Sequence, residues 1–406
     1  MPKPCTYPFS RRIRATPRSF IREILKVTEH PDIISFAGGL PSPAFLDAPG
    51  VSAAAESVLR EDGCAALQYS TTEGYLPLRE WIAERYHSRL GLDVDPDEIL
   101  ITNGSQQILD LLGRIFLNEG DPVTIEAPGY LGAIQAFSQY MPRFCPVALE
   151  NEGPDPVEFT RVLREDNPVF YYAIPNSQNP SGITCTSRRR KEVASLLADR
   201  ETLIVEDDAY GEIRFNGDHL PSYRSLIADR ALLLGSFSKI VAPGLRLGWL
   251  CAPEAVIEQA VTAKQASDLH SNILAQRILC RYLAENDIDD HIAKITRGYA
   301  EQCSLMIRLM EELFPQEVRF TRPDGGMFLW LTLPEGASAM ELYERAMKEK
   351  VAILPGTPFY TDGGGDRSVR LNFSNADGEK IRTGISRLAG VMEKYIPETD
   401  HEKSGD

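Results

Sequence analysis

The sequence lacks the patterns that mark a disulfide framework or a common metal site. Its seven cysteines are an odd number, no two of them form a CxxC pair, and its six histidines are scattered along the chain. Disulfide scaffolds and cysteine-based zinc sites rest on paired or closely spaced cysteines. We therefore expect no metal, a reducing compartment and a cytoplasmic location.

Long apolar runs and an excess of positive charge are also missing. No apolar stretch approaches the ~20 residues that a membrane helix needs. Lys and Arg number 43 against 58 Asp and Glu, which gives a formal net charge of −15. Proteins held on nucleic acid by phosphate neutralisation need a basic surface. Neither nucleic acid nor a membrane is an expected partner.

The motifs of several common enzyme classes are absent. The chain has no G-x-G-x-x-G, G-x-x-x-x-G-K-[ST], H-E-x-x-H or G-x-S-x-G, which removes the simplest dinucleotide, nucleotide, zinc-protease and hydrolase interpretations. Ser236–Lys239 formally matches the S-x-x-K of penicillin-recognising enzymes. Those enzymes also need S-D-N and K-T-G, neither of which occurs here, so this interpretation fails.

What the sequence does contain is an alternation of apolar strands and helical stretches. The strands lack a period of two, which is typical of a mostly parallel sheet buried on both faces by helices. The pattern predicts an α/β fold. After about residue 285 a long helical region covers 286–313, and shorter strands joined by Gly-, Pro- and Asp-rich turns then predict a smaller α+β domain. The predicted strands of the first part are 98–104, 121–129, 168–175, 202–210, 231–239 and 245–253.

Polar clusters follow four of these strands, at the edge where active groups of α/β sheets lie. Residues 103–107 (NGSQQ) stand between a strand and a helix, where free backbone N–H groups suit a phosphate, although a plain helix cap fits equally well. Residues 176–182 (NSQNPSG) fit a binding loop or a simple turn.

The other two clusters carry charge. Glu206, Asp207 and Asp208 are adjacent acids, whose repulsion a metal ion or a protonated ring nitrogen would relieve, unless one is used and two are solvated. Lys239 follows an apolar strand, with Arg246 seven residues later. A buried amine there would have a lowered pKa and would act as a nucleophile or form a Schiff base, whereas a surface lysine would do neither.

Taken in order, the motifs GSQQ, NPSG, D-x-x-Y and S-x-S-K-x6-R, followed by an arginine in the strand VRLNF, form one set. The set resembles the class I aminotransferases, which are fold-type I enzymes dependent on pyridoxal 5′-phosphate. The resemblance covers nearly the whole chain. The stretches SFAGGLPSPAF, LQYSTTEGYLPLRE, EAPGYLGAIQAF, VEDDAYGE and RPDGGMFLWLTLP look most like the 2-aminoadipate (LysN-type) and kynurenine/aminoadipate branch.

The resemblance implies an overall organisation. It implies a mostly parallel, seven-stranded-type sheet flanked by helices, with a smaller α+β domain beside it. The implied divisions are an N-terminal arm over 1–46 that joins the small domain, a large cofactor-binding domain over 47–295, a small domain over 296–396 and a flexible tail over 397–406. It also implies a homodimer with shared active sites.

The resemblance assigns roles around the cofactor. Lys239 would bind pyridoxal 5′-phosphate and then act as the general base. Asp207 would keep the pyridine nitrogen protonated. Tyr210 and Asn179 would hydrogen-bond the ring's phenolic oxygen. Tyr130 would stack on the ring, and the phosphate would be held by Ser105, Gln106, Ser236, Ser238 and Arg246, with Tyr69 reaching it from the partner subunit.

The resemblance also assigns substrate contacts. Arg370 would pair with the α-carboxylate, the backbone at Gly39 would pass close by, and Asn179 and Tyr69 would border the substrate. The first 22 residues are basic and contain no acid, which fits a transit peptide or a solvated arm. In the resembled branch an N-terminal arginine instead meets the substrate's side-chain carboxylate, and Arg22 matches that position.

The implied activity is transfer of an amino group between an amino acid and 2-oxoglutarate. The amino acid would be 2-aminoadipate or of aromatic or branched-chain type. A carbon–sulfur β-lyase on the same fold is the alternative, because such enzymes share the residues that hold the cofactor.

Overall fold

The computed structural model describes residues 7–16, 30 and 32–396 of the 406-residue chain. Its main feature is an eight-stranded sheet in the order β2-β9-β8-β7-β6-β3-β4-β5. Neighbours from β8 to β4 run parallel, whereas β9 is antiparallel to β2 and β8, and β5 is antiparallel to β4. The strands are β2 (Ile99–Thr102), β3 (Pro122–Ala127), β4 (Arg143–Glu150), β5 (Gly153–Pro154), β6 (Phe170–Ala173), β7 (Leu203–Asp207), β8 (Ala231–Ser236) and β9 (Gly248–Cys251).

The predicted α/β fold and mostly parallel sheet are confirmed. All six strands expected from the apolar runs form, because each is buried along most of its length. The sequence did not predict β4, whose exposed and buried residues are mixed because it lies next to the edge. The short β5 beyond it brings the sheet to eight strands instead of seven.

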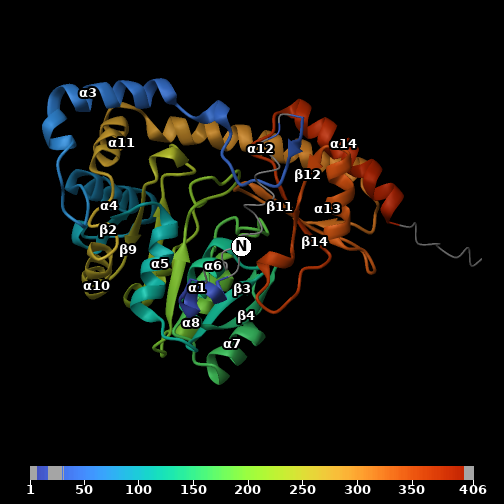
Figure 1. The fold of residues 1–406 in the computed structure, drawn as a ribbon, viewed down its shortest axis with the longest axis horizontal. Helices are drawn as coiled ribbons and strands as arrows, with labels where there is room; N and C mark the ends of the chain where they lie inside the picture. The colour runs from blue at the N-terminus through green and yellow to red at the C-terminus, as the bar shows by residue number, and fades with distance from the viewer. Residues whose placement is uncertain (1–6, 17–29, 31, 397–406) are drawn as a thin grey trace, which may run out of the picture.

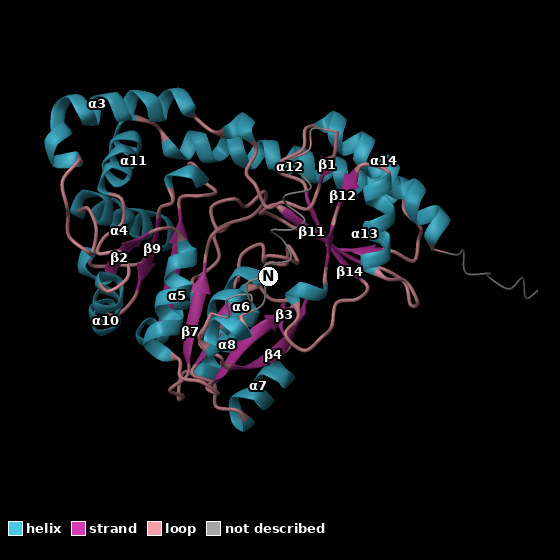
Figure 2. Ribbon diagram, viewed as in Figure 1, coloured by secondary structure: helices cyan, strands magenta, loops and turns pink. Residues whose placement is uncertain are grey.

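Helices cover both faces of this sheet (Figures 1 and 2). Side chains alternate along β6: Phe170 and Tyr172 enter the larger core, and Tyr171 enters a smaller core on the opposite face. Phe137 of α6 packs in the first core and Phe159 of α7 in the second. The flanking helices are α5 (Ser105–Phe116), α6 (Leu131–Ser138), α7 (Pro156–Glu165), α8 (Ser187–Leu197), α9 (Tyr223–Leu226) and α10 (Glu254–Gln265).

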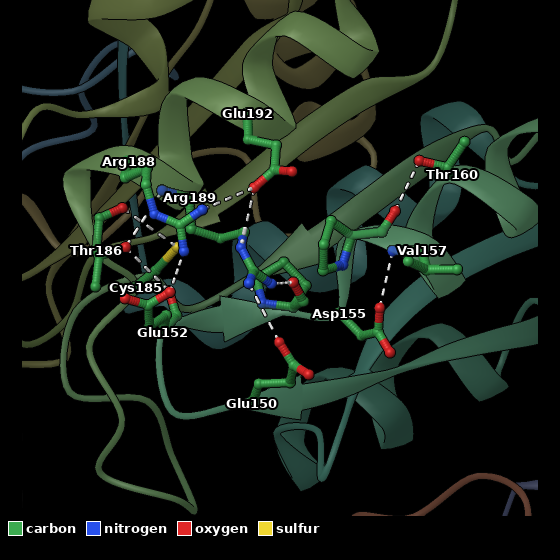
Figure 3. Close-up of polar contacts among 12 residues, drawn as sticks. Glu150, Glu152, Asp155, Val157, Thr160, Cys185, Thr186, Arg188, Arg189 and Glu192 are labelled. Carbon is green, nitrogen blue, oxygen red and sulfur yellow. Dashed lines mark hydrogen bonds and ion pairs between the residues drawn. The ribbon is translucent and has the colours of Figure 1, made fainter.

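The edge of the sheet at β5 is closed by side chains from α8 (Figure 3). Arg189, almost fully buried, donates to the carbonyl of Pro154 and pairs with Glu150 at 3.2 Å. Arg188 pairs with Glu152 in the β4–β5 turn. Because Arg189 occupies the Pro154 carbonyl, this edge offers one acceptor fewer to another strand.

A second sheet of four strands, in the order β10-β11-β14-β13, forms the C-terminal part. Near it, β1 (Ile34–Ser35) pairs in parallel with β12 (Val351–Ala352), so an N-terminal segment joins the C-terminal part of the chain. The strands are β10 (Arg319–Phe320), β11 (Phe328–Thr332), β13 (Leu354–Pro355) and β14 (Ser368–Asn372). The remaining helices are α1 (Arg11–Ala15), α3 (Ala48–Ala66), α4 (Leu76–Leu90), α11 (Ile273–Glu285), α12 (Ile288–Leu313), α13 (Ala339–Lys348) and α14 (Gly378–Tyr395).

In the described part of the chain, no helix combines the length and apolarity required to cross a membrane.

One buried carboxyl in the main sheet has no cationic partner among the groups that act on it. Glu126, near the end of β3, accepts hydrogen bonds from the Tyr171 hydroxyl at 3.2 Å, the Gln178 amide at 3.1 Å and the backbone N–H of Ile174 at 3.4 Å. Burial raises the pKa of Glu126 to about 8, although these three donors oppose the shift. The folded protein therefore holds a proton there that the unfolded chain releases at lower pH.

We predict that Glu126→Gln makes the stability of the protein less dependent on pH. Because the folded pKa lies above the unfolded one, the wild type should lose stability as pH rises from about 4.5 to about 8, by on the order of a few kcal/mol from this group. Urea unfolding across this range measures the loss, which the variant should reduce but not abolish, because burial also raises the pKa of Glu206 to about 7.

Glu165→Gln is the control, because hydrogen bonds from Arg164 and Arg161 lower the pKa of this exposed carboxyl and move its titration below that window. Equal pH dependence in the wild type and Glu126→Gln would contradict the prediction.

Candidate active site

One cavity of about 370 Å³ lies among loops at the carboxyl ends of the central strands and the C-terminal part. It brings together twelve of the predicted site residues from segments far apart in the sequence. The predicted residues that line it are Gly39, Ser105, Gln106, Tyr130, Asn179, Asp207, Tyr210, Ser236, Ser238, Lys239, Arg246 and Arg370.

Asp207 ends β7 and presents a free carboxylate oxygen. Its Oδ2 accepts a hydrogen bond of 2.7 Å from the Tyr172 hydroxyl, whereas its buried Oδ1 has no partner. Burial raises the pKa of Asp207 to about 6, and the Tyr172 hydrogen bond and the nearby Lys239 oppose this. A buried acceptor without a donor is costly, so this oxygen suits a protonated ligand nitrogen.

The three adjacent acids do not compete for one partner. Glu206 accepts from the Ser222 hydroxyl at 2.5 Å, and Asp208 accepts from the Asn176 amide at 2.7 Å. No cluster suited to a metal ion occurs within the described residues. Only Asp207 of the three lines the cavity.

Lys239 follows β8 and directs its amine to the cavity. The amine donates to the backbone carbonyl of Gly39 at 3.1 Å. Burial, together with the positive charges of Arg370 and Arg246, lowers the pKa of Lys239 to about 8, whereas Asp207 opposes the shift. At pH 7 roughly a tenth of this amine is therefore unprotonated, far more than in an ordinary lysine, and nucleophilic attack requires the unprotonated form.

Arg370, in the middle of β14, is a buried cation that has no paired acid among the described residues. Its guanidinium donates to Asn179 Oδ1 at 2.9 Å and to the Ala37 carbonyl at 2.6 Å, while its Nε has no partner. It lies 4.4 Å from the centre of the Phe328 ring. Burial lowers its pKa to about 10, and the groups that oppose this are tyrosines rather than any carboxylate of the described residues. The site therefore suits an anion.

The opposite end of the cavity is rich in donors. Ser105 and Gln106 form the first turn of α5, which no side chain caps, so backbone N–H groups there lack helical acceptors. Arg246 donates to the Asn103 carbonyl at 3.4 Å and lies over this turn. Ser236 and Ser238 border the same cavity. An uncapped helix start with an arginine beside it is a typical phosphate-binding arrangement.

Three further polar side chains complete the lining. Tyr210 and Tyr130 are tyrosines whose pKa burial raises, Tyr130 to about 12, so both keep their protons and remain donors. Asn179 Oδ1 accepts from the Arg370 guanidinium at 2.9 Å, and its side chain also opposes the rise of the Tyr210 pKa, which places it close to both residues.

Two predicted residues are not part of this cavity. Tyr69 has 79% of its surface exposed, and its ring packs edge-on against His270 at 5.8 Å. Its contact with a partner's phosphate stays a prediction. Arg22 lies outside the described residues.

Sequence reasoning missed several residues of the site. Phe328 packs against both Arg370 and Tyr210, yet its only signal was the quoted stretch RPDGGMFLWLTLP. The sequence contains no signal for Tyr172, because this residue resembles any other large residue of a buried strand. The remaining lining residues that were not predicted are Ile174, Ala209 and Pro243.

Comparison with known proteins identifies the family. The family model "Aminotransferase class I and II" matches residues 42–388. The chain belongs to this family. It is 44% identical to a 2-aminoadipate transaminase of Thermus thermophilus, with 93% of this chain and 94% of the relative covered, and 39% identical to aromatic-amino-acid aminotransferase 1 of Thermococcus litoralis, with 96% and 94% covered.

A solved structure shares the fold. LysN, the α-aminoadipate aminotransferase of Thermus thermophilus, complexed with N-(5′-phosphopyridoxyl)-L-leucine, superimposes with a TM-score of 0.90 at 42% identity, covering 95% of this chain and 97% of that one. The chain is therefore an aminotransferase that uses pyridoxal 5′-phosphate. The lyase alternative finds no support among these relatives.

The residues present fit this cofactor. The free Oδ1 of Asp207 suits a protonated pyridine nitrogen, the amine of Lys239 suits an aldehyde, and the uncapped α5 with Arg246 suits a phosphate. Each ligand group thus meets a protein group of matching chemistry.

We predict that Tyr172→Phe moves the acidic limb of cofactor binding to higher pH. The lost hydrogen bond lowers the Asp207 pKa in the wild type, so without it the carboxylate should protonate at higher pH, by up to about one unit. The affinity of the apoprotein for pyridoxal 5′-phosphate is measured at several pH values between about 5 and 8, a range that spans the Asp207 pKa.

Tyr171→Phe is the matched control, because the neighbouring hydroxyl bonds Glu126 on the opposite side of the strand. The prediction is wrong if both variants give the same pH profile.

Proposed function

We propose that this aminotransferase passes amino groups from 2-aminoadipate and from aromatic or branched-chain amino acids to 2-oxoglutarate. The buried guanidinium of Arg370 is the observation that carries the proposal, since it has no carboxylate partner of its own within the described residues. The relatives support the substrate range: one is named a 2-aminoadipate transaminase, one an aromatic-amino-acid aminotransferase, and the LysN complex holds a leucine derivative.

Each site residue has a proposed role. Bound pyridoxal 5′-phosphate supplies a ring that accepts electrons from the substrate Cα. Lys239 carries the cofactor and then moves the Cα proton, for which its lowered pKa of about 8 is suited. Asp207 holds a proton on the ring nitrogen, and Tyr210 and Asn179 donate to the ring's oxygen. Tyr130 stacks on the ring, and the phosphate binds Ser105, Gln106, Ser236, Ser238 and Arg246.

Arg370 binds and orients the substrate. A fork of two parallel N–H groups fixes a carboxylate in one plane, which holds the Cα–H toward Lys239. The carbonyl of Gly39 accepts from the Lys239 amine at 3.1 Å and keeps that segment close to the substrate.

A homodimer with shared sites, in the cytoplasm, completes the proposal. Tyr69 would reach the partner subunit's phosphate. An exposed apolar surface around it supports this, because Leu67, Leu76 and Leu269 expose 71%, 47% and 48% of their surfaces. We further propose the domain divisions 1–46, 47–295 and 296–396, with the β1–β12 pairing supporting the placement of the N-terminal arm.

A two-substrate assay tests the proposed function. The holoenzyme is given one amino acid at a time with 2-oxoglutarate, and glutamate and the matching 2-oxo acid are measured in equal amounts. Release of pyruvate and sulfide from a cysteine-type substrate, without glutamate, would overturn it.

We predict that Arg370→Lys raises KM for the amino acid roughly 100-fold and leaves cofactor affinity unchanged, since an ammonium cannot form the two parallel bonds of a guanidinium. Steady-state kinetics and cofactor titration measure the two effects. Arg322→Lys, an exposed arginine paired with Glu311, is the control and should match the wild type. An unchanged KM in Arg370→Lys would remove Arg370 from the substrate site.

For Arg22 we propose contact with the side-chain carboxylate of glutamate or 2-aminoadipate. Arg22→Ala should lower kcat/KM for glutamate at least about tenfold more than for leucine, because only the dicarboxylate loses an ion pair. Equal losses for the two amino acids would contradict this contact and would fit an Arg22 side chain that is exposed to solvent.

A further inference from the structure

The turn before α5 is bracketed by one carboxylate from a distant segment. Asp268 follows α10, which packs beside α5 (Figure 1). Its Oδ2 accepts from the Asn103 amide at 2.5 Å and from the Gln107 amide at 2.7 Å. These two residues stand immediately before and after Gly104, Ser105 and Gln106. One oxygen therefore fixes both ends of the donor-rich turn.

A buried lysine neutralises this carboxylate. Lys264 is completely buried, and its amine donates to Asp268 at 2.8 and 2.9 Å and to Gln107 Oε1 at 3.0 Å. Gln107 Oε1 also accepts from the backbone N–H of Asn103 at 2.8 Å. The four side chains form one closed network outside the cavity, since none of them is among the described residues that line it.

Small shifts of this turn would affect two donor groups at once. Gly104 has a φ of +76°, and a Cβ there would lie 2.6 Å from Arg246 Nη2. The Asn103 carbonyl accepts from the same Nη2 at 3.4 Å. The orientation of the Ser105 and Gln106 N–H groups and the placement of the Arg246 guanidinium are therefore coupled through one turn.

We propose that Asp268, neutralised by Lys264, is a positioning residue for the cofactor phosphate. It holds the turn from Asn103 to Gln107 so that the first N–H groups of α5 and the Arg246 guanidinium meet the same anion. The inference rests on the proposed role of Ser105, Gln106 and Arg246.

A comparison of two cofactor forms tests this role. Removing Asp268 alone would leave the buried Lys264 charge unpaired, so the variant is the double substitution Lys264→Met/Asp268→Leu, which removes both charges. The apoprotein is titrated with pyridoxal 5′-phosphate and with pyridoxal, which lacks the phosphate. We expect a loss of at least about tenfold for pyridoxal 5′-phosphate and little change for pyridoxal. Inorganic phosphate should also compete less well.

Two further variants sharpen the result. Lys264→Met/Asp268→Asn keeps one acceptor oxygen and should bind pyridoxal 5′-phosphate with intermediate affinity. Arg114→Met/Asp110→Leu removes an ion pair of 3.1 Å farther along the same helix and should bind both forms as the wild type does. Thermal melting of each apoprotein reports the cost to folding separately.

The outcomes separate the two claims. Equal losses for both cofactor forms, or none, would overturn the positioning role and leave Lys264 and Asp268 as a structural pair. If the leucine variant does not fold, the ratio of the two affinities in the asparagine variant decides in the same way. Failure of the wild type to bind pyridoxal 5′-phosphate would instead overturn the proposed function.

Discussion

Buried charge without an internal counter-charge is the constraint on which this site depends. Lys239, Asp207 and Arg370 lie around one cavity, and none of them forms an ion pair with another described residue. Burying an ionised group costs free energy unless it is paired, so each departs from its ordinary pKa in the direction that favours its neutral form. The aldehyde and the protonated ring nitrogen of the cofactor, together with the carboxylate of an amino acid substrate, would compensate all three. The folded chain thus holds three buried ionisable groups whose counter-charges a ligand has to supply.

The fold maintains this arrangement by drawing the three groups from separate rigid elements. Asp207 ends β7 and Lys239 follows the neighbouring parallel strand β8, so their separation is set by the sheet. Arg370 comes from the second sheet. Hydrogen bonds to Asn179 and to the backbone carbonyl of Ala37 hold its guanidinium at the cavity. The Asp207 carboxylate, in turn, depends on Tyr172 of β6. The strand ends therefore position the reactive side chains, and residues of neighbouring strands, such as Tyr172, hold them by hydrogen bonds.

Much of the fold was predicted from the alternation of apolar strands and helical stretches, because apolar runs and turn residues indicate local structure directly. Polar groups at strand ends stand out against apolar surroundings, which marked Asp207 and Lys239 as candidates, whereas residues such as Tyr130 and Arg370 were predicted from the family resemblance. Tyr172 and the Lys264–Asp268 pair were not found. A tyrosine in a buried strand resembles an ordinary packing residue, and a lysine followed four residues later by an aspartate resembles an exposed ion pair. Their roles arise only from contacts between residues far apart in sequence, such as Asp268 with Asn103.

Reductive trapping tests the central claim most directly. The holoenzyme is treated with borohydride and digested, and the peptide carrying the cofactor mass is sequenced by mass spectrometry. The account predicts a single labelled lysine, Lys239, because its amine alone combines a cavity position with a pKa lowered to about 8 among the described residues. The buried Lys264, held by Asp268, is the internal comparison and should stay unlabelled. Label on another lysine, or on none, would contradict the account.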